Sequence, residues 1–281
     1  MPSSLAPSRR AGVPERAANA VRLEGIARTF AMAGGDREVL RGVDVELASG
    51  EIVAIVGPSG CGKSTLLRLV GGLDAPTSGA ISLGDAGIAD TDERTAIAFQ
   101  EPRLLPWRTL AQNVELGLPR QADRREGRER VRELLHLVGL DHAADQRPRE
   151  VSGGMAQRAS LARALARDPR VLLLDEPFGA LDALTRLRMQ DLLLDIHAAQ
   201  PTTVLFVTHD VEEALYLADR VLLLRSLADA GTDHDAPSVA RTIAVPGIRP
   251  RDRADRALAD LRAELLKGLG VETHHTLQEN R

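Results

Sequence analysis

The stretch GPSGCGKST at residues 57–65 follows directly on the apolar run EIVAIV at residues 51–56. It places three glycines, a lysine and several hydroxyl side chains at the end of what reads as a buried strand. Glycine loses more conformational entropy on folding than any other residue. A loop of this composition therefore needs a ligand, or another strong constraint, to hold it in shape.

The spacing of this loop matches G-x-x-x-x-G-K-[ST] between a buried strand and a predicted helix, STLLRLVGGL at 64–73. In such a loop the backbone N–H groups surround the phosphates of a nucleotide, and the helix directs its positive end at them. We expect Lys63 to reach the β- and γ-phosphates and the Ser64 hydroxyl to bind Mg²⁺. The predicted ATP-binding residues of the loop are Gly57, Pro58, Ser59, Gly60, Cys61, Gly62, Lys63, Ser64 and Thr65.

A second polar element follows a later apolar run, VLLLDEP at 171–177. Asp175 ends this run and is expected to lie beside the phosphate loop as a magnesium ligand. Glu176 follows at once and is the candidate for polarising the attacking water. Asp-Glu after a strand also occurs as a helix cap, but with a phosphate loop upstream we favour the catalytic interpretation.

A second predicted anion site begins at VSGGMAQR, residues 151–158, where Ser-Gly-Gly opens a helix. One nucleotide needs only one phosphate loop, so the second site requires another explanation. His209, in TVLFVTH, and Gln100, in AIAFQEP, carry no functional claim on their own, because single polar residues at strand ends usually have structural roles.

With these motifs in this order, residues 21–225 resemble the ATP-binding cassette (ABC) ATPases of transporters. The resemblance implies that VSGGM is the signature that closes on the ATP of a partner subunit, and that Val151 and Ala156 are small departures from it. It also assigns roles to single residues. At the chain's own nucleotide, Phe30 is expected to stack on adenine, Gln100 to contact Mg²⁺ and the γ-phosphate, and His209 to contact the γ-phosphate. At the dimer interface, Ser152, Gly153 and Gly154 are expected to contact the partner's ATP, and Asp182 of GALD lies in the interface. The implied catalytic residues are Glu176, His209 and Lys63, and the implied metal ligands are Ser64, Gln100 and Asp175.

Two further stretches, residues 100–114 and 176–193, resemble the nitrate, sulfonate and taurine importer branch, and most of all the aliphatic sulfonate importer ATPases. In that family the region of RLLPW receives a helix of the membrane subunit, which makes Trp107 a candidate docking residue. Nitrate, taurine or another small organic solute remains an alternative cargo. A GTPase is disfavoured because no N-K-x-D motif is present. A small-molecule kinase is disfavoured because it has no use for VSGGM. A non-transport ABC ATPase is disfavoured because such proteins usually carry two cassettes or large extra domains.

The predicted fold is α/β, an ABC cassette of the P-loop NTPase class with a mostly parallel core sheet, an antiparallel β subdomain and a helical subdomain. Four apolar runs, at 51–56, 171–175, 203–209 and 221–225, predict strands buried on both faces. We expect half-buried strands at 21–30 and 43–51. The predicted organisation is a disordered tail at 1–20, the cassette at 21–225 with its helical subdomain at about 100–165, and a partly helical extension at 226–281.

The composition limits the cellular setting. The formal net charge is −4 and aromatic residues make up 2% of the chain, which disfavours a nucleic-acid partner. The single cysteine, Cys61, rules out an intramolecular disulfide, and no apolar run reaches membrane-spanning length. By the family resemblance, we expect a peripheral protein on the cytoplasmic face of the membrane. Its expected partners are a second copy of itself, two transmembrane permease subunits and an extracytoplasmic solute-binding protein.

Overall fold

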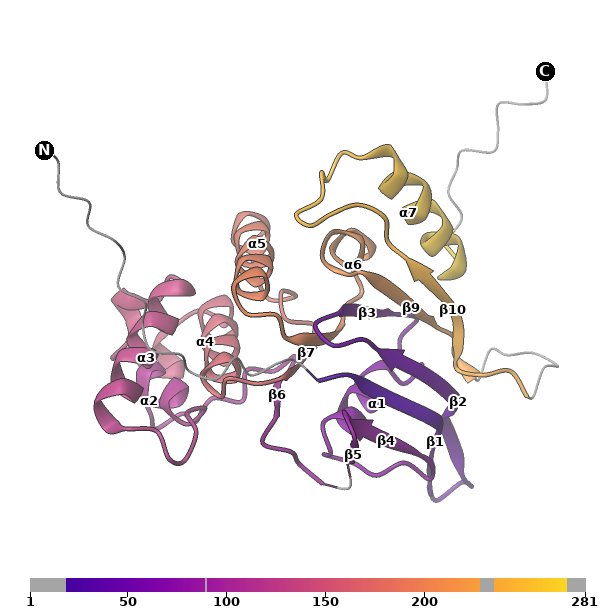
Figure 1. The fold of residues 1–281 in the computed structure, drawn as a ribbon, viewed down its shortest axis with the longest axis horizontal. Helices are drawn as coiled ribbons and strands as arrows, with labels where there is room; N and C mark the ends of the chain where they lie inside the picture. Colours follow the sequence, from indigo (N-terminus) through magenta and orange to yellow (C-terminus); the bar gives the residue numbers. More distant parts are fainter. Residues whose placement is uncertain (1–18, 89, 228–234, 272–281) are drawn as a thin grey trace, which may run out of the picture.

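The computed structural model describes residues 19–88, 90–227 and 235–271, arranged as two sheets with helices around and between them (Figure 1). The predicted tail at 1–20 lies outside this part of the chain except for its last two residues. Among the helices in these ranges, none has the length and apolar character needed to cross a membrane.

The larger sheet has six strands in the order β10-β9-β3-β8-β7-β6. Its strands are β3 (Ile52–Val56), β6 (Thr95–Ala98), β7 (Val171–Asp175), β8 (Thr203–Val207), β9 (Arg220–Leu224) and β10 (Val239–Ala244). The four predicted apolar strands form its centre and pair in parallel. Every residue of β3, β7 and β8 is buried, because both faces of the sheet are covered. The predicted fold class is confirmed.

Strands β6 and β10 extend this sheet at its two edges and were not among the four predicted core strands. Strand β10 belongs to the C-terminal extension and pairs antiparallel with β9, so it covers an edge that would otherwise expose unpaired backbone groups. Helix α7 (Arg256–Gly268) follows, with Asp255 capping its N-terminus. Its Leu258 and Leu265 are buried, and the helix itself agrees with the predicted partly helical extension.

The smaller, antiparallel sheet has the order β2-β1-β4-β5. It consists of β1 (Val21–Phe30), β2 (Arg37–Leu47), β4 (Ser78–Leu83) and β5 (Ala86–Gly87). The second strand was predicted at 43–51, but it starts earlier and ends at a turn in which the Glu51 N–H donates to the Ala48 carbonyl at 3.0 Å. Helix α1 (Lys63–Val70) lies between the two sheets, and its leucines share one apolar core with both of them.

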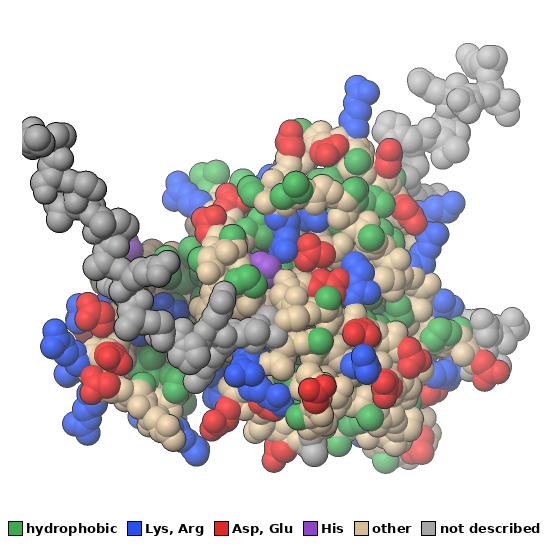
Figure 2. Space-filling model, in the orientation of Figure 1, with side chains coloured by type: hydrophobic (Ala, Val, Ile, Leu, Met, Phe, Trp, Pro, Cys, Tyr) green, Lys and Arg blue, Asp and Glu red, His purple; other side chains and the backbone are tan. Residues whose placement is uncertain are grey.

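Helices α2 (Leu110–Glu115), α3 (Arg124–Leu137) and α4 (Gly153–Ala166), with two short 3-10 turns at Asp141–Ala143 and Pro148–Glu150, form a separate lobe at the left of Figure 1. Helices α5 (Ala183–Ala199) and α6 (Val211–Leu217) cover the face of the larger sheet away from α1. On the molecular surface, acidic and basic side chains are interspersed over the face drawn in Figure 2, as a small net charge leads one to expect.

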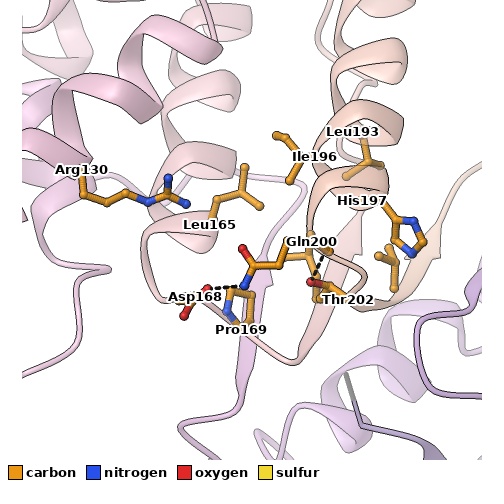
Figure 3. A pocket seen from close by; sticks show the side chains of 11 residues that line it. Arg130, Leu165, Asp168, Pro169, Leu193, Ile196, His197, Gln200 and Thr202 are labelled. Atoms are coloured by element: carbon orange, nitrogen blue, oxygen red, sulfur yellow. Dashed lines mark hydrogen bonds between the residues drawn. The ribbon is translucent and has the colours of Figure 1, made fainter. Parts of the chain in front are cut away.

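A small crevice of about 30 Å³ marks the junction between the helical lobe and the sheet (Figure 3). Leu165 of α4 faces Leu193 and Ile196 of α5 there, and Gln200 donates a 2.8 Å hydrogen bond to Asp168. The crevice has room for bound water but for little more. The crevice lies at the amino ends of β7 and β8, opposite the edge that carries Asp175, and it contains none of the predicted site residues.

Candidate nucleotide site

The loop between β3 and α1 is shaped by close contacts that only glycine permits. A Cβ atom on Gly57 would lie 2.7 Å from both the Cys61 Sγ and the Leu224 carbonyl oxygen. A Cβ atom on Gly62 would lie 2.7 Å from Leu40, and this glycine has a φ of 99°. Both positions therefore exclude other residues on steric grounds. The sequence-predicted phosphate loop has a defined shape within the chain itself.

Lys63 starts helix α1 and folds back over this loop. Its Nζ donates hydrogen bonds to the carbonyl oxygens of Gly57 at 2.8 Å and Pro58 at 2.9 Å. The ammonium group and the N-terminus of an eight-residue helix thus direct positive charge at the same space. This arrangement suits the phosphates of a nucleotide.

Ser64 and Asp175 meet across the gap between α1 and the end of β7. The Ser64 hydroxyl donates to the Asp175 Oδ1 at 3.2 Å. Burial raises the pKa of Asp175, while the Ser64 hydrogen bond acts in the opposite direction. A buried carboxylate beside a hydroxyl group offers the hard oxygen ligands that Mg²⁺ binds, so these two residues fit the predicted metal site.

Glu176 follows Asp175 and holds two of the other predicted site residues. Its Oε2 accepts a hydrogen bond from the Gln100 amide at 3.0 Å and lies 3.3 Å from the His209 Nδ1. Its backbone has a φ of 47°, an unusual conformation outside glycine, and its N–H donates to the Val207 carbonyl at 2.9 Å. Strain of this kind commonly marks functional positions. Gln100 and His209, which are far apart in sequence, are therefore both brought to the carboxylate of Glu176.

The segment that carries Gln100 is fixed to helix α4 by two residues that were not predicted. The buried Gln157 donates to the Phe99 carbonyl at 3.1 Å, and Arg163 donates to the carbonyls of Pro102 and Arg103, both at 2.8 Å. Burial lowers the pKa of Arg163. Nothing in the local sequence distinguishes these side chains from ordinary helix residues, so only the fold could identify them.

Phe30 lies at the end of β1, where it pairs with Arg37 of β2. Arg37 in turn approaches the phosphate loop, with its Nη2 3.9 Å from where a Cβ of Gly60 would be. The Arg28 guanidinium covers the Phe30 ring at 4.3 Å from its centre. The end of this hairpin is next to the phosphate loop, as the prediction for Phe30 requires.

The second anion site, residues 152–154, belongs to the helical lobe rather than to the phosphate loop. Ser152 caps α4 by accepting from the Met155 N–H at 3.3 Å. A Cβ atom on Gly154 would lie 3.1 Å from Leu181, in the loop that precedes Asp182. In the ranges that the structure describes, no hydrogen bond or ion pair joins residues 152–154 to residues 57–65. The fold brings the signature to Asp182, which caps α5, and not to its own phosphate loop.

A phosphate loop on a parallel sheet, together with a Ser-Gly-Gly helix start in a separate helical lobe, defines an ATP-binding cassette. A family model described as "ABC transporter" matches residues 40–179. Relatives more than 45% identical cover over four fifths of the chain. The chain belongs to the ABC transporter family, whose members bind and hydrolyse ATP.

Individual relatives and a solved structure show which members of the family this chain resembles. The chain is 47% identical to aliphatic sulfonates import ATP-binding protein SsuB 1 of Mesorhizobium japonicum, over 92% of this chain and 94% of that relative. It is 51% identical to SsuB 2 of Burkholderia lata, over 83% and 81% of the two chains. Among structures it resembles the dimeric, post-hydrolysis cassette MJ0796 bound to ADP and Pi, with a TM-score of 0.72 and 33% identity over 81% of this chain and 100% of that one.

Proposed function

We propose that this chain is the ATP-hydrolysing subunit of an importer for aliphatic sulfonates. The observation that carries the proposal is its identity of 46–51% to several proteins named as aliphatic sulfonates import ATP-binding proteins, over most of the chain in each case. The identity of the cargo is the most specific part of this proposal. Nitrate, taurine or another small organic solute is the alternative, because the residues of the nucleotide site do not distinguish one cargo from another.

We propose that the residues of the site divide the chemistry as follows. Lys63 and the backbone N–H groups of residues 57–65 hold the phosphates, and Ser64, Asp175 and Gln100 hold Mg²⁺. When bound there, Mg²⁺ supplies neutralising charge at the phosphate oxygens. Glu176 accepts a hydrogen bond from the attacking water and aligns it with the γ-phosphate.

His209 and Lys63 then offset the charge that develops on the transferred phosphoryl group. The contacts of Glu176 with Gln100 and His209 support this division, because the carboxylate is held at the point where both side chains meet. His209 is 68% exposed, so it is free to turn toward the nucleotide.

We further propose that two copies of the chain bind two ATP molecules between them. Residues 152–154 of each copy complete the site of the other, and Asp182 lies in the interface. Two features support this: the signature is separated from its own phosphate loop, and the similar cassette MJ0796 is described as dimeric. A Cβ atom on Gly153 would meet nothing within 4 Å, which leaves this helix start open to a partner.

The proposed membrane partners are two permease subunits, served by a solute-binding protein outside the cell, with this chain on the cytoplasmic face. A rigidly held aromatic residue supports a docking site. Trp107 is 67% exposed, and its loop is fixed by the buried Asn113, which accepts from the Leu105 N–H at 2.7 Å. An exposed tryptophan on a fixed loop is a typical anchor of a protein interface.

Growth of a strain lacking this gene tests the cargo directly. The strain is grown with an alkanesulfonate, taurine or sulfate as sulfur source, and separately with nitrate as nitrogen source. We expect growth to fail on the alkanesulfonate alone, and to return with the wild-type gene but not with Lys63→Ala. Failure on taurine or nitrate instead would overturn the sulfonate assignment while keeping the ATPase mechanism.

A further inference from the structure

A buried carboxyl group, that of Glu213, lies on α6 directly behind the loop of His209. The residue is only 4% exposed, and its Oε1 has no hydrogen-bond partner within the described residues. Burial raises the pKa of Glu213 to about 8, with neighbouring Asp210 acting in the same direction. A buried acid without a direct ion pair destabilises a fold when it is charged. Packing alone therefore does not explain this residue.

The carboxyl group of Glu213 lies close to the segment around His209. The neighbouring side chains of Thr208 and Gln190 act to lower its pKa, and the Glu213 N–H donates to the Asp210 carboxylate at 3.3 Å. The Thr208 hydroxyl also accepts from the Asp210 N–H at 3.0 Å. Thr208 and Asp210 flank His209, so Glu213 adjoins both residues beside the proposed catalytic histidine.

The same chain of contacts continues to the C-terminal extension. The Gln190 Oε1 accepts from the Arg253 Nη1 at 2.8 Å, which leaves the Gln190 Nε2 as the donor available to Glu213. Arg253 also donates to Asp191 at 3.3 Å and lies over the Tyr216 ring at 3.5 Å from its centre. One side chain of the extension thus clamps α5 to α6. Gln190, only 2% exposed, is the buried link between them.

The backbone beside Arg253 is itself fixed to α6. The side chain of Arg251 is 8% exposed and donates to the Tyr216 and Val245 carbonyls, both at 3.1 Å. The bond to Tyr216 satisfies a backbone acceptor at the C-terminal end of α6, where a helix leaves carbonyl groups without helical partners. The bond to Val245 joins Arg251 to the residue that follows β10. Arg253 therefore extends from a firmly held segment.

Arg186 connects the loop before Asp182 with Glu213. Arg186 of α5 lowers the pKa of Glu213 by its positive charge. Its guanidinium also donates to the carbonyls of Phe178 at 3.4 Å and Leu181 at 3.2 Å. Asp210 and Arg186 are thus the charged groups that act on the carboxyl group, one from each helix.

We propose that Arg253, Gln190 and Glu213 form a positioning relay through which the C-terminal extension sets the His209 loop against the Asp182 loop for ATP hydrolysis. This inference rests on the proposed function, because it takes His209 to act at the γ-phosphate. Within the described residues no hydrogen bond joins the relay to residues 57–65. Its loss should therefore lower turnover and leave ATP affinity unchanged.

Steady-state ATP hydrolysis by the full-length chain tests the relay. We expect Arg253→Ala to lower kcat by about 10-fold, with the KM for ATP within about twofold of wild type. Arg253→Lys, which can still donate to Gln190, should recover most of that loss. The matched control is Arg262→Ala. It removes a 2.8 Å surface ion pair between the same extension and Glu212 of α6 without touching the relay, and its kcat should stay at the wild-type value.

A kcat for Arg253→Ala equal to that of Arg262→Ala would overturn the relay. If Arg253→Ala does not fold, Gln190→Met interrupts the relay at its centre and decides in the same way. Glu176→Gln is measured alongside to distinguish failure of the relay from failure of the proposed function. If neither wild type nor Glu176→Gln hydrolyses ATP, the proposed function is refuted instead. In that case amide hydrogen exchange at residues 207–210 decides: faster exchange in Arg253→Ala than in Arg262→Ala supports the relay, and equal rates overturn it.

Discussion

The phosphate loop and the signature are both polar helix starts, but only the phosphate loop is enclosed by its own chain. Each places backbone N–H groups and a hydroxyl residue at the start of a helix. The first is enclosed by its own chain, with no room for a Cβ on Gly57 or Gly62 and with Lys63 folded over the loop. The second is open at Gly153. One site is therefore enclosed within the subunit, and the other is the one that we propose completes the nucleotide site of a second copy.

The largest effect should come from Glu176→Gln, which keeps the shape of the built site and removes the group that accepts a proton. Loss of a general base lowers turnover by about 10²–10⁴-fold. ATP binding should remain, because Lys63 and the backbone of the loop are untouched. The measurements are steady-state hydrolysis and nucleotide affinity. Turnover at the wild-type rate would remove Glu176 from the mechanism.

The next prediction contrasts one glycine from each site. Gly62→Ala forces a side chain into a φ of 99° and against Leu40, so it should lower the free energy of unfolding by about 1–3 kcal/mol. Gly153→Ala meets open space and a helical backbone, so stability should stay the same or rise slightly. Urea denaturation compares the two variants. Equal losses of stability would contradict the contrast between an enclosed site and an open one.

A pH-dependent effect is expected where the proposed relay supports the His209 loop. The pKa of Glu213 is raised from 4.5 in the unfolded chain to about 8 in the fold. The stability that this group contributes is therefore fully present below pH 4.5, and is lost as pH rises toward 8, at about 1.4 kcal/mol per pH unit at most. Glu213→Gln should remove this loss.

The measurement is the difference in unfolding free energy between wild type and Glu213→Gln at pH 5 and pH 9. We expect Glu213→Gln to gain on wild type by a few kcal/mol, on the order of 3, as the pH rises. A difference that stays constant across this range would show that Glu213 does not titrate there.

The smallest effect concerns Cys61 inside the enclosed loop. Because Cys61 lies in the phosphate loop, alkylation of its thiol should block ATP binding, and bound ATP should protect it. The structure buries this cysteine, and burial raises the pKa of its thiol. Since the thiolate is the reactive form, modification near pH 7 should be slow, about 10-fold or more below that of a free thiol. Mass spectrometry follows the rate, and rapid labelling would contradict an enclosed loop.

Sequence patterns predicted the parts of the fold that carry strong local signals. The four central strands are continuous apolar runs, and the phosphate loop is a fixed motif. Strand β6, with the sequence TAIA, is too short for periodicity to mark it, and β10, VARTIA, carries exposed polar residues because it is an edge strand. These two strands were therefore missed.

The contacts within the site were predictable only in part. Motifs and family resemblance selected Gln100, Glu176 and His209, but not that one carboxylate holds the other two. Gln157 and Gln190 were missed entirely, since a buried glutamine in a helix has no local signature. Their importance comes from partners more than 50 residues away, Phe99 and Arg253.

The central claim is that residues 152–154 complete a site on a second copy, and sedimentation of Glu176→Gln with and without ATP and Mg²⁺ tests it most directly. We predict a species of twice the subunit mass of 30.2 kDa with ATP, and the single subunit without it. Adding Gly153→Asp, which places a negative charge at the open helix start, should abolish the dimer while ATP still binds. A Glu176→Gln subunit that binds ATP and stays monomeric at every concentration, or a dimer that Gly153→Asp leaves intact, would contradict the account.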